Sequence, residues 1–168
     1  YRLWEFQVYA INTEKKADYW EVEALFDLCF APGREALSSY RLRENSNPIS
    51  ELCMVARDKE QILAGAIRYW PVKIIEHEAL LLGPIAVHPT RQGEGLGSLL
   101  IKDSLALAKK LDYSRILLIG DLSYYGRLGF KRLTNIKMPK PTNPDRILGI
   151  ELISGAWNIP SGPIKSLK

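Results

Sequence analysis

Three glycines within five residues, Gly93, Gly95 and Gly97, separate a hydrophobic run from an amphipathic helix pattern. Residues 79–87 before them are nearly all apolar, as in a strand buried on both faces. A strand that turns through glycines into a helix leaves backbone N–H groups unpaired at the positive end of the helix dipole. Such a turn is a site for phosphate, because glycine allows an anion to approach the backbone closely.

Two common phosphate-binding motifs do not fit this stretch. A P-loop requires a lysine followed by serine or threonine after its last glycine, whereas Ser98 and Leu99 follow Gly97. A dinucleotide-binding fingerprint that starts at Gly93 and Gly95 requires a third glycine where Ser98 stands. A third interpretation is a glycine-rich loop that binds no ligand, although three glycines would then make the loop needlessly flexible.

Hydrophobic periodicity predicts a mixed α/β fold. Strand patterns are expected at residues 3–11, 52–57, 62–69, 79–87, 115–119 and 147–153, and helix patterns at residues 18–30, 35–44 and 97–111. Asp18 and Glu21 are spaced as in a capping box at the start of the first helix. The order of strand, helix and strand around residues 97–111 predicts a right-handed crossover between two parallel strands.

Composition predicts one globular domain over residues 1–168. The chain is 46% apolar and 25% charged, which is ordinary for a domain with its own hydrophobic core. The net charge of +4 is scattered without a block of five basic residues, so no nucleic-acid partner is expected. No run approaches the roughly 18–20 apolar residues of a membrane-spanning helix, so no membrane partner is expected either.

The cysteines and histidines favour neither a disulfide nor a metal site. Cys29 and Cys53 lie in separate apolar stretches, which is typical of buried thiols in a reducing compartment. His77 and His88 lack cysteine or carboxylate ligands at zinc spacing. The residues that follow Tyr1 do not have the pattern of a signal peptide. We therefore expect a cytoplasmic protein without a metal ion.

The spacing Gln-x-x-Gly-x-Gly, at Gln92, Gly95 and Gly97 after a Val-x-Pro, resembles the acyl-CoA signature of the GNAT acetyltransferases. The resemblance implies acetyl-CoA as cosubstrate, with its pyrophosphate held by the loop 92–98 and its pantetheine arm by strand residues 85–87. It also implies the GNAT fold, a mixed sheet of six to seven strands flanked by about four helices, in which strands four and five splay apart.

Pro84 agrees with this resemblance on physical grounds. Proline lacks the N–H that a sheet ladder needs, so within a strand it marks a bulge or an edge. The fourth strand of the family has such a bulge, after which backbone groups are free to bond a ligand. The resemblance implies that the amide of Ile85 or Ala86 polarises the thioester carbonyl as an oxyanion donor does.

A second motif, Tyr-x-x-x-Gly-Phe from Tyr125 to Phe130, extends the resemblance over residues 79–130. It implies that Tyr125 lies near the CoA sulfur and protonates the departing thiolate, for which a phenol with a pKa of about 10 is suited. An aromatic pair that packs a short helix on the sheet is the alternative interpretation, and it is favoured for Tyr124. The implied cofactor-binding residues are Ile85, Ala86, Val87, Arg91, Gln92, Gly93, Glu94, Gly95, Leu96, Gly97, Ser98, Gly120, Asp121, Tyr124 and Arg127.

Two positions depart from the family pattern. Many relatives bond the pantetheine with an asparagine where this chain has Leu118, so backbone contacts of Gly120 and Asp121 are expected instead. Some relatives use a strand-four glutamate as general base where this chain has Leu81. The candidate bases are then Glu76, His77 and Glu78, a water chain, or no protein group.

These patterns predict an N-acetyltransferase that moves an acetyl group from acetyl-CoA to an amine of a small molecule or peptide by direct attack. The alternative is a non-catalytic acyl-CoA-binding regulatory protein, which the missing strand-four glutamate favours. A monomer and a homodimer are both compatible with the sequence. The acceptor cleft is expected to be lined by Tyr40, Arg41, Arg43, Arg68 and Trp70.

Overall fold

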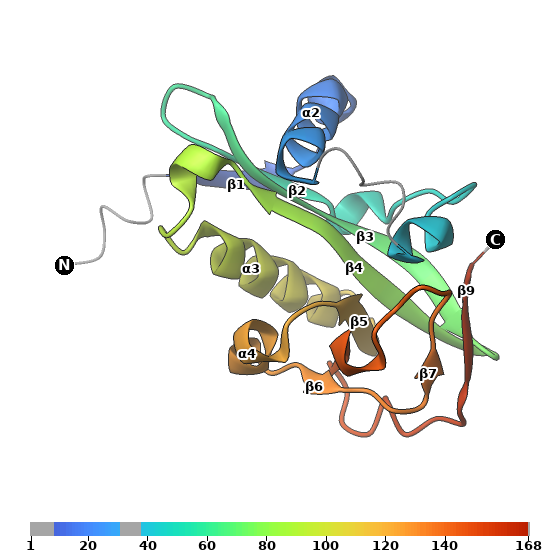
Figure 1. Ribbon diagram of the computed structural model, residues 1–168. Helices are drawn as coiled ribbons and strands as arrows, with labels where there is room; N and C mark the ends of the chain where they lie inside the picture. The colour runs from blue at the N-terminus through green and yellow to red at the C-terminus, as the bar shows by residue number, and fades with distance from the viewer. Residues whose placement is uncertain (1–8, 31–37, 168) are drawn as a thin grey trace.

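The computed structural model describes residues 9–30 and 38–167, which form a mixed sheet with helices on both faces (Figure 1). The strands are β1 (Ala10–Thr13), β2 (Met54–Arg57), β3 (Leu63–Ile74), β4 (His77–Val87), β5 (Arg115–Ile119), β6 (Lys131–Arg132), β7 (Ile136–Lys137), β8 (Ile147–Glu151) and β9 (Gly162–Ser166). The α-helices are α2 (Tyr19–Phe30), α3 (Leu96–Lys110) and α4 (Leu122–Tyr125). Short 3₁₀ turns are η1 (Lys16–Asp18), η3 (Ser38–Leu42), η4 (Ser50–Leu52), η5 (Pro89–Arg91), η6 (Gly126–Leu128) and η7 (Pro144–Arg146).

The order of the strands confirms the mixed α/β fold. The sheet runs β1-β2-β3-β4-β5-β8-β6, and β9 pairs with both β3 and β7. β4 and β5 are parallel and are joined by α3, as the pattern around residues 97–111 predicts. Over the described residues the sheet has nine strands where six to seven were expected, because β6, β7 and β9 are short segments of the proline-rich tail.

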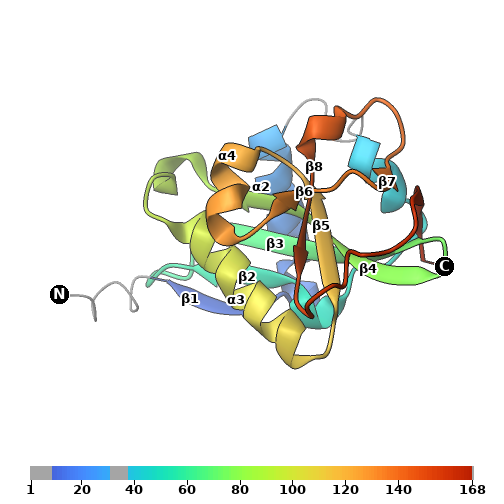
Figure 2. The ribbon, with the colours of Figure 1, turned by 90° about the horizontal axis from the view of Figure 1, so that it is seen from below.

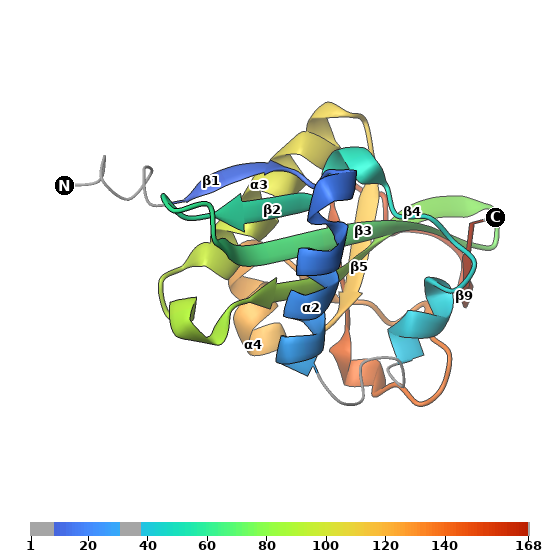
Figure 3. The same cartoon turned by 90° about the horizontal axis from the view of Figure 1, so that it is seen from above.

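Alternating side chains of the central strands bury opposite faces of the sheet. Met54 and Ala56 of β2 pack in the cluster under α3, whereas Val55 packs with Val22 and Phe26 of α2. Figures 2 and 3 show α3 crossing one face of the sheet and α2 crossing the other.

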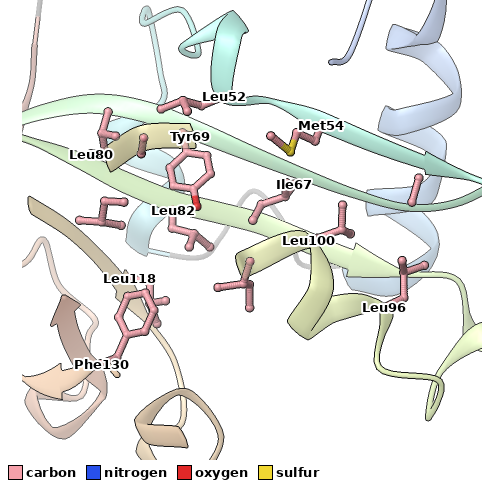
Figure 4. Close-up of a cluster of buried hydrophobic side chains, with 14 of the residues drawn as sticks. Leu52, Met54, Ile67, Tyr69, Leu80, Leu82, Leu96, Leu100, Leu118 and Phe130 are labelled. Atoms are coloured by element: carbon pink, nitrogen blue, oxygen red, sulfur yellow. The ribbon is translucent and has the colours of Figure 1, made fainter. Parts of the chain in front are cut away.

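The larger core lies between α3 and the central strands (Figure 4). Leu96 and Leu100 of α3 pack toward Ile67 and Tyr69 of β3, and all four are buried. The Tyr69 hydroxyl lies 2.6 Å from Ser104 Oγ, so this buried polar pair is satisfied inside the core. This packing fixes the N-terminal half of α3 against the central strands of the sheet.

The N-terminal predictions need correction. The predicted strand at 3–11 lies mostly outside the described residues, and β1 begins at Ala10. Asp18 and Glu21 do not form the predicted capping box, because Asp18 Oδ2 instead accepts from the Lys15 amide at 2.8 Å and so caps η1. Its Oδ1 and the Glu21 carboxylate bind the Arg57 guanidinium. The described part of the predicted helix 35–44 is only the turn η3, and Asn45 has a φ of 57°, which ends any helical path.

The central hairpin and the tail also differ from the predictions. β3 extends through Pro71, whose missing N–H lies between the segments of β3 that pair with β2 and with β9. β4 begins at His77, so His77 and Glu78 are strand residues and not loop residues. In the tail, β9 was not expected, because a single buried isoleucine among polar residues gives no strand pattern.

Candidate active site

The predicted bulge is present in β4. Ile67 of β3 pairs with Ile85 and Tyr69 pairs with Leu82, so Gly83 and Pro84 together oppose one residue of β3. Gly83 has a φ of 137°, which L-residues with a side chain rarely adopt. Its carbonyl accepts a hydrogen bond of 2.7 Å from the Trp70 indole, which holds the bulge in place.

Beyond the bulge, β4 and β5 separate. They pair only at Leu80 with Ile116 and at Leu81 with Leu117, although both strands continue further. The space that follows has a volume of about 360 Å³ and is here termed the β4–β5 opening. Its lining includes residues 82–85 of β4, residues 118–121 at the end of β5, and Tyr124, Tyr125, Phe30, Arg43 and Arg146.

The direction of the β4 amides follows from its pairing with β3. The His88 N–H donates to Ala64 C=O at 2.8 Å, and Ala86 lies opposite Ala66. Since alternate residues of an antiparallel strand point their N–H groups to the same neighbour, the Ala86 amide faces β3. The amides of Ile85 and Val87 point away from β3, and Ile85 lines the β4–β5 opening. Of the two amides that the resemblance implies as oxyanion donors, that of Ile85 is therefore the one not directed at β3.

The glycine-rich loop ends in an exposed helix N-terminus. Gly93 and Gly95 have φ values of 87° and 81°, and Gly95 provides no side-chain cap to α3. Leu99 donates the first backbone bond of the helix, to Gly95 C=O at 3.1 Å. Among the residues described, the N–H groups of 96–98 therefore have no backbone partner, which fits a phosphate group at this position.

The short helix α4 places two tyrosines at the other wall of the opening. The Tyr124 hydroxyl lies 3.0 Å from Ser98 Oγ and so joins α4 to the N-terminus of α3. Tyr125 packs edge-to-face against Phe130 and Tyr124. Burial raises the pKa of Tyr125 to about 12, the nearby Tyr124 also raises it, and Arg146 opposes both effects. The phenol is therefore protonated at neutral pH.

The segment after β5 approaches Tyr125 closely. A Cβ on Gly120 would lie 2.5 Å from Tyr125 Cε2, so only glycine fits there. The Gly120 N–H donates to Arg146 C=O at 2.9 Å, and the Asp121 carbonyl accepts from the amides of Tyr124 and Tyr125 at 3.1 and 2.9 Å. The Gly120 amide is therefore already bonded within the protein. Arg146 itself had no sequence signal, because it lies in the irregular tail.

Two expected cofactor contacts, Arg91 and Glu94, bind other protein groups. Arg91 forms an ion pair with Asp58 and donates to the Tyr9 hydroxyl at 3.0 Å. The same hydroxyl donates to Glu94. Of the remaining expected residues, Leu96 is buried in the core, Gln92 donates to Val87 C=O at 3.3 Å, and the Arg127 guanidinium lies over the Tyr124 ring.

The suggested bases lie away from the opening. Glu76, His77 and Glu78 are at the β3–β4 hairpin, at the opposite end of β4 from the bulge, and none of them lines the opening. The extension of β4 back to His77 explains the error, because it lengthens the hairpin away from the bulge. Leu81, which stands where some relatives have the strand-four glutamate, is buried, as is usual for an apolar residue in a central strand.

A second cavity of about 400 Å³ adjoins the opening, and Arg43 and Pro84 line both. It is here termed the acceptor cavity. Tyr40, Arg68 and Trp70 also line it, as predicted, whereas Arg41 does not. Arg68 is buried and binds Glu14 through two hydrogen bonds of 2.9 and 3.0 Å.

Comparison with known proteins agrees with this geometry. The GNAT acetyltransferase domain model matches residues 50–132, which include β4, the glycine-rich loop and α4. The chain belongs to the GNAT superfamily. The N-acetyltransferase YhbS of Escherichia coli K12 is 28% identical to this GNAT protein over 123 residues, which cover 72% of each chain.

Solved GNAT structures share the fold over nearly the whole chain. The structure of Escherichia coli YhbS in complex with CoA has a TM-score of 0.83 at 23% identity and covers 96% of this chain and 91% of its own. A GNAT acetyltransferase of Brucella melitensis in complex with acetyl-CoA has a TM-score of 0.71 at 25% identity and covers 96% and 97%. In the described parts of this GNAT protein, no helix is long and apolar enough to cross a bilayer.

Proposed function

We propose that this GNAT protein transfers the acetyl group of acetyl-CoA to an amine of a small molecule or peptide. The observation that carries the proposal is the β4–β5 opening, which is lined by Tyr124 and Tyr125 and shares Arg43 and Pro84 with the acceptor cavity. Tyr124 also contacts Ser98, which places the N-terminus of α3 beside the opening. The complexes of YhbS with CoA and of the Brucella protein with acetyl-CoA support the choice of cosubstrate.

Each wall of the opening has one part in the proposed reaction. The pyrophosphate binds the amides of residues 96–98, and the pantetheine arm lies along β4. The Ile85 N–H points at the thioester carbonyl and stabilises the oxyanion that forms when the amine attacks. As the C–S bond breaks, Tyr125 donates its phenolic proton to the departing thiolate. None of the expected bases lines the opening or the acceptor cavity. The amine loses its proton in the acceptor cavity, to water or to one of the carboxylates that line it, Glu14, Glu23 and Glu44.

Calorimetric titration with acetyl-CoA, CoA and ATP tests the cosubstrate. We expect micromolar binding of both CoA species and weaker binding of ATP, because ATP lacks the pantetheine arm. Amine-dependent release of CoA thiol then tests transfer. If neither CoA species binds at millimolar concentration, the glycine-rich loop is not a pyrophosphate site and the proposal is wrong.

A further inference from the structure

We propose that Asp58, Arg91, Tyr9 and Glu94 form a positioning network that orders the pyrophosphate loop before acetyl-CoA binds. The inference rests on the proposed function, since it assigns the loop to the pyrophosphate. These four side chains come from separate segments: Tyr9 precedes β1, Asp58 follows β2, Arg91 ends η5, and Glu94 lies between the loop glycines.

Asp58 is the rigid end of the network. Its Oδ1 accepts hydrogen bonds of 2.9 Å from the amides of Glu60 and Ile62, and its own amide donates to Ile62 C=O at 3.0 Å. Its carboxylate is buried. The hydrogen bond from the Ile62 amide is the largest of several interactions that hold the pKa of Asp58 below the usual value of 3.8. The side chain is therefore ionised and fixed to the tight β2–β3 turn.

Arg91 connects this turn to the loop. One terminal nitrogen binds Asp58 and the other donates to the Tyr9 hydroxyl at 3.0 Å, while the guanidinium lies 5.6 Å from the centre of the Tyr9 ring. The Tyr9 hydroxyl donates in turn to Glu94. The residue before the loop and a residue within it are thus both tied to the same buried aspartate.

The need for such an anchor follows from the loop's composition. Glycines lose more conformational freedom than other residues when they become ordered, and ordering on binding reduces affinity. A loop that is held in the free protein loses less freedom when the cofactor binds. Arg91 then acts through loop geometry, and its charge is already neutralised by Asp58 instead of by a phosphate.

Asp58→Asn separates this role from direct phosphate binding. The asparagine keeps the oxygen that accepts the Glu60 and Ile62 amides but cannot pair with Arg91. If Arg91 positions the loop, the Kd for CoA and the KM for acetyl-CoA rise about fivefold or more, with kcat and the KM for the amine unchanged. If Arg91 binds phosphate directly, its release from Asp58 leaves CoA affinity equal or tighter, which overturns the proposal.

Asp18→Asn is the matched control, because Asp18 forms the same kind of ion pair with Arg57 but does not touch the loop. Hydrogen exchange of the Arg91 and Leu99 amides, which donate to His88 C=O and Gly95 C=O at the two ends of the loop, gives a readout in the ligand-free protein that needs no CoA binding. We expect faster exchange in Asp58→Asn and in Tyr9→Phe, and wild-type exchange in Asp18→Asn. If hydrogen exchange is unchanged in both Asp58→Asn and Tyr9→Phe, the proposal is wrong, whatever the Kd values of these variants for CoA.

The same experiments keep the two proposals apart. If the wild-type protein fails to bind CoA, the proposed function is wrong, while loop exchange still tests the anchor. If the wild-type protein binds CoA and Asp58→Asn binds it equally well, only the positioning network is wrong.

Discussion

At the scale of single residues, Tyr125 is the side chain on which the chemistry depends most. Its ring packs against Phe130 and Tyr124, and the residue lines the β4–β5 opening. Tyr125→Phe keeps the ring contacts and removes the proton. We expect kcat to fall about 100-fold with the Kd for CoA unchanged, as for loss of a general acid.

Tyr124→Phe is the control for that variant, since it changes the neighbouring hydroxyl. It breaks the contact with Ser98 Oγ at the N-terminus of α3. We expect it to raise the KM for acetyl-CoA more than it lowers kcat. Steady-state kinetics with both variants measures kcat and the KM for acetyl-CoA. A Tyr125→Phe protein with wild-type kcat would show that water, and not Tyr125, protonates the thiolate. A wild-type protein that binds CoA but has no turnover with any amine would favour the regulatory alternative.

The raised pKa of Tyr125 also predicts how stability depends on pH. In the unfolded chain the phenol ionises at its ordinary pKa of 10, whereas in the folded protein burial keeps it protonated until about pH 12. The stabilising contribution is therefore complete below pH 10 and is lost as the pH rises toward 12. Between pH 9 and pH 11, urea denaturation should show a loss about 1 kcal/mol larger for the wild type than for Tyr125→Phe. Equal losses in the two proteins would mean that Tyr125 is solvated.

At the scale of elements, the junction between the glycine-rich loop and α3 depends on the left-handed conformation of Gly95. Nothing lies within 4 Å of a Cβ added there, so the strain of a φ of 81° is the only cost of an alanine. We expect Gly95→Ala to lower the free energy of unfolding by about 1 kcal/mol and to weaken CoA binding. Guanidinium denaturation measures the first effect and calorimetry the second.

Gly126→Ala is the matched glycine substitution. Gly126 has a φ of −59°, and an added Cβ would make an ordinary contact of 3.5 Å with Leu122. We expect this variant to be as stable as the wild type or slightly more stable, because alanine restricts the unfolded chain. If both variants changed stability by the same amount, the positive φ of Gly95 would not be the cause.

At the scale of the whole molecule, the opening lies between two parts of the sheet that meet through only two residue pairs of β4 and β5. A ligand that contacts β4, the N-terminus of α3 and α4 together joins these parts in the folded state alone. At 100 times its Kd, acetyl-CoA should stabilise the protein by about 2.7 kcal/mol. For a chain of this length, that corresponds to a rise in Tm of roughly 5–10 °C.

Scanning calorimetry with acetyl-CoA, and with ATP at the same concentration, measures this effect. ATP should raise the Tm less, because it reaches the loop but not the opening. An equal rise with both ligands would show that binding stops at the phosphate site.

Local sequence patterns were enough to predict the unit from β4 to β5. Its strand and helix periods, its glycine turn and the proline of its bulge are local features, and each acts through its own backbone. The resemblance of residues 125–130 to the family motif implied that Tyr125 lies at the cofactor site, and Tyr125 does line the β4–β5 opening. Within this unit, β5 begins and ends at the predicted residues, and α3 begins one residue earlier and ends one residue earlier than predicted.

Which residues face the β4–β5 opening depends instead on contacts between distant segments. β9 pairs with β3 from about ninety residues away in the sequence. Arg91 binds Asp58 from 33 residues away, and neither contact produces a periodic pattern in the sequence. Likewise, the acceptor cavity is lined by residues from separate segments, among them Tyr40, Trp70 and Pro84 of the β4 bulge. Local sequence specifies the conformation of a segment through its own dihedral angles and apolar period. Contacts between distant segments depend on how the whole core packs, and they decide which charged residues face a ligand and which face the protein.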